Sequence, residues 1–147
     1  MDQWLTRLVA LLEVEDVVVR RSAATVLGAL GSSEKEVVAG LTSALSSDDH
    51  ELRLRILDAL AAIGAPAAFE AVVPFLDERG ELGVHAREAM AAMGGRILPR
   101  LRSRFAGAGS TARRRILGIA ARLRGASGFD LLMRALDRPI VCTSGNL

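Results

Sequence analysis

The two histidines are the first residues whose types suggest chemistry, because imidazole and carboxylate groups at short spacing can hold a metal ion. His50 is followed by Glu51, whereas His85 is followed by Ala86. One His-Glu pair and one isolated histidine do not form a ligand set. We therefore predict no metal site and expect His50 to lie exposed at the start of a helix.

Two carboxylates, Asp58 and Glu88, would lie side by side if two similar helices were neighbours. Paired carboxylates can carry out acid–base catalysis, but catalysis needs several groups that converge in one pocket. A solvated or arginine-paired surface is the simpler interpretation. We therefore predict a protein that is not an enzyme and has no cofactor.

Arginine dominates the C-terminal part of the chain. Residues 1–95 carry a net charge of −7 and residues 96–147 carry +9, and Gly109 to Gly125 contains five arginines and no acid. Basic residues bind phosphates through counterion release, although no aromatic residue that could stack on bases interleaves with the arginines of Gly109 to Gly125. Nucleic-acid binding through residues 96–124 is therefore an alternative function, with Arg114, Arg115 and Arg122 as candidate anion-binding residues.

The elements that would position these residues repeat along the chain. Leu30, Ile63, Met93 and Leu123 end four similar segments at steps of 33, 30 and 30 residues. Each segment has an apolar stripe at helical spacing, and a shorter amphipathic segment precedes it. In the first and fourth segments the stripe consists of Val19, Ala23, Val26, Leu27 and Leu30, and of Ala112, Ile116, Ile119, Ala120 and Leu123.

This period predicts an all-α fold, a right-handed α-α superhelix (solenoid) of about four helix pairs plus a terminal half repeat. Gly31, Gly64 and Gly94 are expected to end helices, and residues 33–36 and 48–51 resemble capping boxes. The predicted domain covers residues 1–136, and residues 137–147 are a non-repeating tail. Its units are residues 4–31, 35–64, 67–94 and 96–124, with a half unit at 128–136.

The phrases VRRSAATVLGALG and LRLRILDALAAIGAP resemble HEAT repeats, particularly the HEAT-like repeats first associated with phycobilin lyases. Each has an arginine eleven residues before the closing glycine, Arg20 or Arg53, and Arg113 is their counterpart in the fourth unit. The resemblance implies structural arginines that pair with carboxylate or carbonyl groups of a neighbouring repeat. The third unit departs from the pattern, because Gly83 stands in place of the arginine.

Proteins similar to this one are mostly scaffolds that bind macromolecules along a concave surface. We therefore expect a non-enzymatic scaffold that binds protein partners, and the second alternative is an accessory subunit of a bilin-lyase-like enzyme. The candidate partner-binding residues are outward positions of the second helices, namely Arg21, Leu54, Leu57, Val84, Arg87, Arg114 and Leu117. The alternative for the apolar ones is burial between adjacent repeats, because solenoid helices are contacted on both flanks.

The single cysteine, Cys142, excludes an intramolecular disulfide, and no signal peptide or apolar run of the ~20 residues that span a bilayer is present. We therefore expect a cytoplasmic protein with no membrane contact. The first helix is apolar although no repeat precedes it, which makes self-association through an exposed end a further hypothesis.

Overall fold

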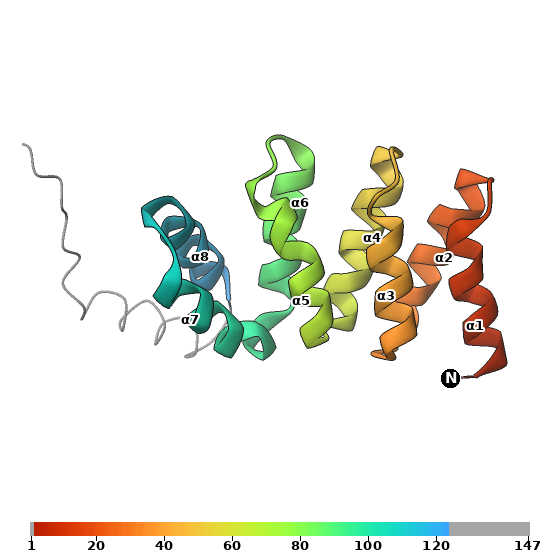
Figure 1. The fold of residues 1–147 in the computed structure, drawn as a ribbon, viewed down its shortest axis with the longest axis horizontal. Helices are drawn as coiled ribbons and strands as arrows, with labels where there is room; N and C mark the ends of the chain where they lie inside the picture. The colour runs from red at the N-terminus through yellow and green to blue at the C-terminus, as the bar shows by residue number, and fades with distance from the viewer. Residues whose placement is uncertain (1, 124–147) are drawn as a thin grey trace, which may run out of the picture.

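The computed structural model describes residues 2–123 and contains no strand within that range. Its helices form pairs that stand side by side in one elongated row (Figure 1). The first helices of the pairs are α1 (Gln3–Ala10), α3 (Lys35–Ala44), α5 (Pro66–Val72) and α7 (Leu98–Gly107), and the second helices are α2 (Val17–Leu30), α4 (His50–Ile63), α6 (Glu81–Ala92) and α8 (Ser110–Arg122). The predicted all-α solenoid is confirmed. The half unit at 128–136 and the tail lie outside the described residues.

Glycines end the second helices as expected. Gly31, Gly64 and Gly94 have φ angles of 64°, 60° and 68°, a left-handed conformation that a side chain would disfavour. The turns within the pairs use a different device, because Asp16 and Asp49 accept hydrogen bonds from the first backbone N–H groups of α2 and α4.

The predicted capping box at residues 33–36 is wrong, since α3 begins after Glu34 without a side-chain cap. In the other predicted box the cap is Asp49, whose carboxylate lies 2.7 Å from the backbone nitrogen of Leu52.

Two prolines lie in the first helical segment of the third pair. Pro66 begins α5, and Pro74 lies in a 3-10 segment, η2 (Val73–Asp77), that continues α5 towards the turn.

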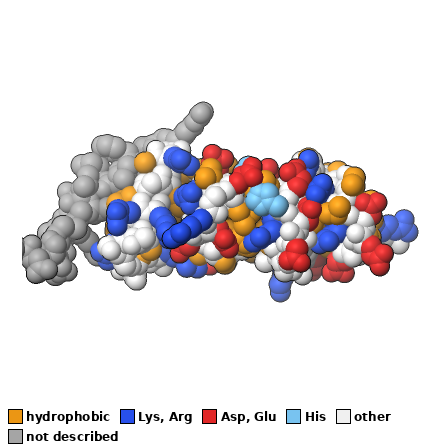
Figure 2. All heavy atoms as spheres, turned by 90° about the horizontal axis from the view of Figure 1, so that it is seen from above, with side chains coloured by type: hydrophobic (Ala, Val, Ile, Leu, Met, Phe, Trp, Pro, Cys, Tyr) orange, Lys and Arg blue, Asp and Glu red, His pale blue; other side chains and the backbone are white. Residues whose placement is uncertain are grey.

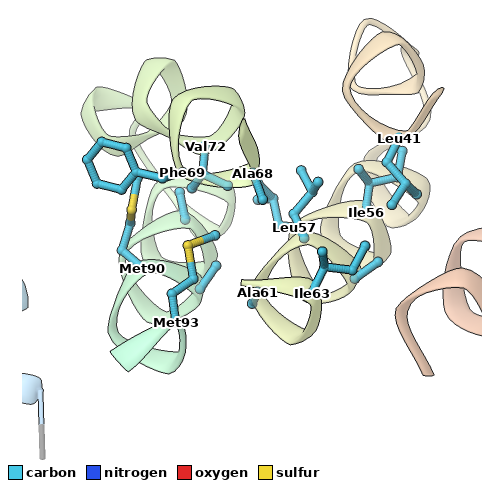
Figure 3. Packing of buried hydrophobic residues seen from close by; sticks show 14 of the residues in the cluster. Leu41, Ile56, Leu57, Ala61, Ile63, Ala68, Phe69, Val72, Met90 and Met93 are labelled. Atoms are coloured by element: carbon cyan, nitrogen blue, oxygen red, sulfur yellow. The ribbon is translucent and has the colours of Figure 1, made fainter. Parts of the chain in front are cut away.

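The core is one continuous cluster of apolar, mostly aliphatic side chains between the two layers of helices, with Phe69 as its largest member (Figure 3). Most positions of the predicted stripes are buried in it. Four are not, because Val26, Leu30 and Ala112 are exposed and Val19 is half-buried. Val26 and Leu30 belong to the first pair, on the side that a preceding pair covers in the other repeats.

The first two second helices approach each other very closely. A Cβ atom on Gly28 would lie 2.7 Å from Cα and 2.8 Å from Cβ of Ala59, so any side chain on Gly28 would push α2 away from α4. Ala61 occupies the equivalent position one repeat later, and Figure 3 shows it on the side of α4 that faces Met93. Small residues at this position therefore lie between successive second helices.

No helix within residues 2–123 combines the length and apolar character needed to cross a membrane.

Candidate functional site

The surface that the second helices expose differs from the predicted partner-binding surface. Around each helix, the outward positions follow the predicted ones by one residue. Leu54 and Leu57 are only 7% and 0% exposed, so the prediction that they contact a partner is wrong. The sequence interpretation placed them on the free side of α4, but α4 packs against other helices on both flanks. Leu57 belongs to the interior cluster (Figure 3).

The remaining residues of that prediction have mixed environments. Val84 and Arg114 are exposed, whereas Arg21, Arg87 and Leu117 are half-buried. Their predicted role in binding a partner stays a prediction, although Arg21 and Arg87 already make contacts within the solenoid.

The outward positions of the second helices form three rows along the solenoid, which we call the second-helix face. All of them are exposed except His85 and Arg115, which are half-buried. The rows are offset by one residue from the predicted rows. The first row is Ser22, Arg55, His85 and Arg115, the second is Thr25, Asp58, Glu88 and Gly118, and the third is Ala29, Ala62, Ala92 and Arg122. The signal that could have located these rows is the small-residue series Gly28, Ala61 and Ala91, which indicates close helix contact instead of free surface.

Polar contacts link neighbouring helices across this face. Arg55 Nη1 lies 3.2 Å from Thr25 Oγ1, and Arg55 Nε donates to Glu51 Oε1 at 2.9 Å. His85 Nε2 lies 3.4 Å from Asp58 Oδ1. Asp58 of α4 is therefore paired with a histidine of α6, and this pairing fits the solvated-surface interpretation of Asp58 and Glu88.

The end of the solenoid that carries the turns within the pairs is acidic over much of its length. Three turn segments, residues 13–16, 48–51 and 77–81, contain most of the acids there. Figure 2 looks onto this end and shows acidic side chains over the α1–α6 part, with arginines towards α7 and α8. Acids at these positions also interact favourably with the N-terminal dipoles of the second helices.

His50 lies at this acidic end as the first residue of α4, and its side chain is exposed as predicted. Its Nε2 lies 2.8 Å from Glu81 Oε2 of the next repeat. Within residues 2–123, no group of three or more His, Cys, Asp or Glu side chains is placed to hold a metal ion.

Arg21 joins the first two repeats at the same end. Its Nε and Nη2 atoms lie 2.9 and 2.5 Å from the two carboxylate oxygens of Asp49. This hydrogen bonding is the main reason why the pKa of Asp49 lies below its usual value and the pKa of Arg21 lies above its own. Asp49 thus caps α4 and binds α2 at once.

Two of the structural arginines, Arg20 and Arg113, contact the carbonyl ends of first helices, and for α1 this end is the 3-10 segment η1 (Leu11–Glu13) that continues the helix. Arg20 Nε donates to the carbonyl of Leu12 at 2.9 Å, and Arg113 Nε donates to the carbonyl of Phe105 at 3.3 Å. Both carbonyls belong to the same helix pair as the arginine, not to a neighbouring repeat as the resemblance implied. The cation meets the negative end of the helix dipole there.

Arg53 behaves differently from these two arginines. Its guanidinium lies 5.3 Å from the ring centre of Phe75, in the next repeat, and its Nε is buried without a hydrogen-bond partner among the described residues. It lines an open groove of about 560 Å³ between the α3–α4 turn and the α5–η2 segment.

Arg87 replaces the arginine that the third repeat lacks. A Cβ atom on Gly83 would lie 1.8 Å from the carbonyl oxygen of Glu78, so the turn leaves no room for a side chain. Arg87, one helical turn later, donates to the carbonyl of Leu76 at 3.0 Å. The carbonyl group at the end of the first helix therefore accepts a hydrogen bond from an arginine at a different position. This explains why the third repeat has Gly83 where the other repeats have an arginine.

Within residues 96–123, three arginines of the basic region are paired with acids of the preceding repeat. Arg100 and Arg104 of α7 both bind Glu70 of α5, at 3.0 and 2.6 Å. The Arg104 hydrogen bond is the main cause that lowers the pKa of Glu70. Of the three candidate anion-binding residues, Arg115 pairs with Asp77.

Arg114 and Arg122, the other two candidates, are exposed and have no hydrogen bond or ion pair recorded within residues 2–123. The structure therefore does not bring the three candidates together as a set of free cations. Their role in anion binding stays a prediction.

Comparisons with known proteins agree with this geometry. The family model described as HEAT repeats matches residues 5–92, more than half of the chain. The chain is also similar to the crystal structure of an engineered protein from the Northeast Structural Genomics Consortium, with 19% identity and a TM-score of 0.53 over 91% of this chain and 68% of that one. This likeness concerns the fold alone. No curated protein matches the sequence.

Proposed function

The chain belongs to the HEAT repeat family, whose repeats generally mediate protein–protein interaction, and from this premise we propose that it is a scaffold that binds a protein partner on its second-helix face. The observation that carries this proposal is the alignment of largely exposed rows over the second helices of four successive repeats. Such rows match an extended or helical polypeptide, which presents contacts at regular spacing along its own axis.

The chemistry of the face indicates the kind of segment that it would bind. Ala29, Ala62 and Ala92 form a row of low relief against which a partner can lie closely. Asp58 and Glu88 stand beside this row in the middle repeats, and Arg122 continues it on α8. We infer a partner segment that is basic where it meets α4 and α6 and acidic where it meets α8.

Site-specific photo-crosslinking in cells that naturally contain the protein tests this proposal. A photoreactive residue at Ala62 or Ala92 should capture a protein partner, whereas the same residue at Ala39 of α3 or Ser103 of α7, both exposed on first helices, should not. Reversing the charges with Asp58→Arg and Glu88→Arg should weaken capture at Ala92. Equal capture from both layers would contradict the assignment of the second-helix face.

Nucleic-acid binding is the second candidate, favoured by eight arginines and no acid within residues 96–123. Arg114 and Arg122 are the exposed cations available to phosphates. Fluorescence anisotropy with duplex and single-stranded oligonucleotides at low salt tests it. Replacing both arginines by alanine should reduce the salt slope by about 2, since each lost phosphate contact removes roughly one unit. No binding of either oligonucleotide at low salt would remove this candidate.

A further inference from the structure

The first repeat carries an apolar end surface that nothing in residues 2–123 covers. Trp4, Val26 and Leu30 are 50%, 43% and 47% exposed and lie on α1 and α2. They belong to the small set of large apolar side chains that the described part of the chain exposes. We call these three residues the N-terminal end face.

The repeat register shows what such a surface normally contacts. Each residue of the N-terminal end face has one counterpart in each of the other three repeats, and all nine counterparts are 6% exposed or less. Those of Trp4 are Val37, Ala68 and Ile97, those of Val26 are Ala59, Ala89 and Ile119, and those of Leu30 are Ile63, Met93 and Leu123. In the second repeat this surface packs on the preceding pair, as the contact of Ala59 with Gly28 shows. The N-terminal end face therefore corresponds to the surface that, in the other repeats, packs against the preceding helix pair. We call the opposite surface of a pair, which packs against the next repeat, its leading side.

The last second helix offers such a side. Gly28 and Ala24 form the leading side of α2, where both are buried against the next repeat. Their counterparts on α8 are Ala121 and Leu117, of which Ala121 is exposed and Leu117 is half-buried. α8 thus presents a small residue and a leucine at the positions that contact the next repeat elsewhere.

Charge adds a specific match between these two ends. The Arg21–Asp49 pair joins the first repeat to the second, at 2.5 Å. In the repeat register, Arg114 of α8 corresponds to Arg21, and Asp16, the cap of α2, corresponds to Asp49. Placing α2 of one molecule against α8 of another would bring an arginine and a capping aspartate together as in the existing pair.

We propose that a second copy of this chain covers the N-terminal end face, with the two copies joined head to tail. The leading side of α8 packs on Trp4, Val26 and Leu30, and Arg114 binds Asp16 of the next copy. The basic last pair, which has eight arginines and no acid within residues 96–123, then meets a first pair that contains Asp2, Glu13, Glu15 and Asp16 together with Arg7, Arg20 and Arg21, so the charge match is local to Arg114 and Asp16. A head-to-tail contact uses different surfaces on the two partners and leaves an end free, so assembly continues beyond a dimer.

Sedimentation velocity of the full chain over a range of concentrations tests the proposal. We expect the mean mass to rise with concentration past that of a dimer, and to fall at high salt because the ion pair is screened. A monomer at all concentrations would overturn the proposal, including a monomer whose own residues 128–136 occupy the α8 side. A closed dimer would overturn it as well, because a closed dimer leaves no free end to which a third copy could bind.

Charge reversal identifies the residues in contact. Arg114→Asp and Asp16→Arg should each weaken self-association at least tenfold when studied alone, since each places like charges at the contact. An equimolar mixture of the two variants should assemble again, because every junction then pairs an arginine with an aspartate. Arg122→Asp is the matched control on α8, and it should assemble like the wild type. Failure of the mixture to assemble would overturn the predicted pairing.

Loss of the Asp16 cap can itself weaken α2, so two further variants separate folding from contact. Asp16→Asn keeps a capping side chain and should still weaken assembly at low salt. Leu30→Asn changes a side chain that is exposed in the single chain, so it should preserve helical circular dichroism and abolish assembly. Assembly of Leu30→Asn at wild-type strength would contradict the proposed contact.

Discussion

The first two repeats and the last two are joined by different proportions of apolar packing and ion pairing. Between α2 and α4, the backbone of Gly28 lies directly against Ala59, so the two helices are in close contact there. Between the third and fourth pairs, arginines reach back to acids, as Arg100 and Arg104 do to Glu70 and Arg115 does to Asp77. Within residues 2–123, the first interface adds one ion pair, between Arg21 and Asp49, to this close packing, whereas the later one includes three ionic contacts that bridge the repeats.

This difference changes the interpretation of the basic C-terminal region. An excess of arginine suggests an anionic ligand when only the sequence is considered, but several of these arginines already serve as links to the preceding repeat. Exposed ion pairs contribute little energy individually, whereas apolar burial contributes ~25 cal/mol per Å². We therefore expect the two interfaces to respond very differently to substitution, salt and acid.

The largest effect should come from Gly28→Leu. The new side chain would clash with both Cα and Cβ of Ala59, so α2 and α4 must separate, and we expect a loss of about 1–3 kcal/mol in the free energy of unfolding. Urea unfolding followed by circular dichroism measures it. Gly118→Leu on α8, where no atom lies within 4 Å of the added Cβ, is the matched control and should be neutral or slightly stabilising. Equal losses in both variants would contradict the packing difference.

A smaller effect is expected from Glu70→Gln, which removes the charge shared by Arg100 and Arg104. Because all three side chains are more than a third exposed, we expect a loss of about 0.5 kcal/mol that disappears in high salt. Parallel urea titrations at low and high salt would measure this loss. Glu36→Gln, at an exposed acid of α3 with no partner recorded within residues 2–123, should show no such salt-dependent loss.

The smallest effect concerns the ion pair of the first interface and its dependence on pH. The Arg21 hydrogen bond lowers the pKa of Asp49 in the folded state. The resulting stabilisation is therefore present above the unfolded-state pKa of about 4 and is lost as the pH falls through the lower folded-state value. Asp49→Asn keeps the helix cap but removes the titrating group.

Thermal unfolding at pH 7 and pH 3 measures the contribution of the Arg21–Asp49 pair to stability. The decrease in Tm between the two pH values should be smaller in Asp49→Asn than in the wild type. In Asp48→Asn, one residue away and outside the Arg21 pair, the decrease should equal that of the wild type. A smaller decrease in Asp48→Asn would indicate a general charge effect.

The repeat period, the helix pairs and the glycine stops could be predicted because each depends on local chemistry. Gly31 and Gly64 end helices through their own backbone freedom, and the apolar stripes follow from helical spacing. The candidate surface was predicted less well. A helical wheel separates apolar from polar positions, but Leu54 and Leu57 are buried by helices that the wheel does not contain.

The sequence by itself determined that this protein is a row of helix pairs with an acidic and a basic part, since period and charge are properties of the chain order. Tertiary structure decided which other positions of the second helices meet solvent, because neighbouring helices bury Gly28, Leu54 and Leu57. It also decided which arginines remain exposed. Ion pairs form between repeats about 30 residues apart, and only the packed solenoid brings those side chains within bonding distance.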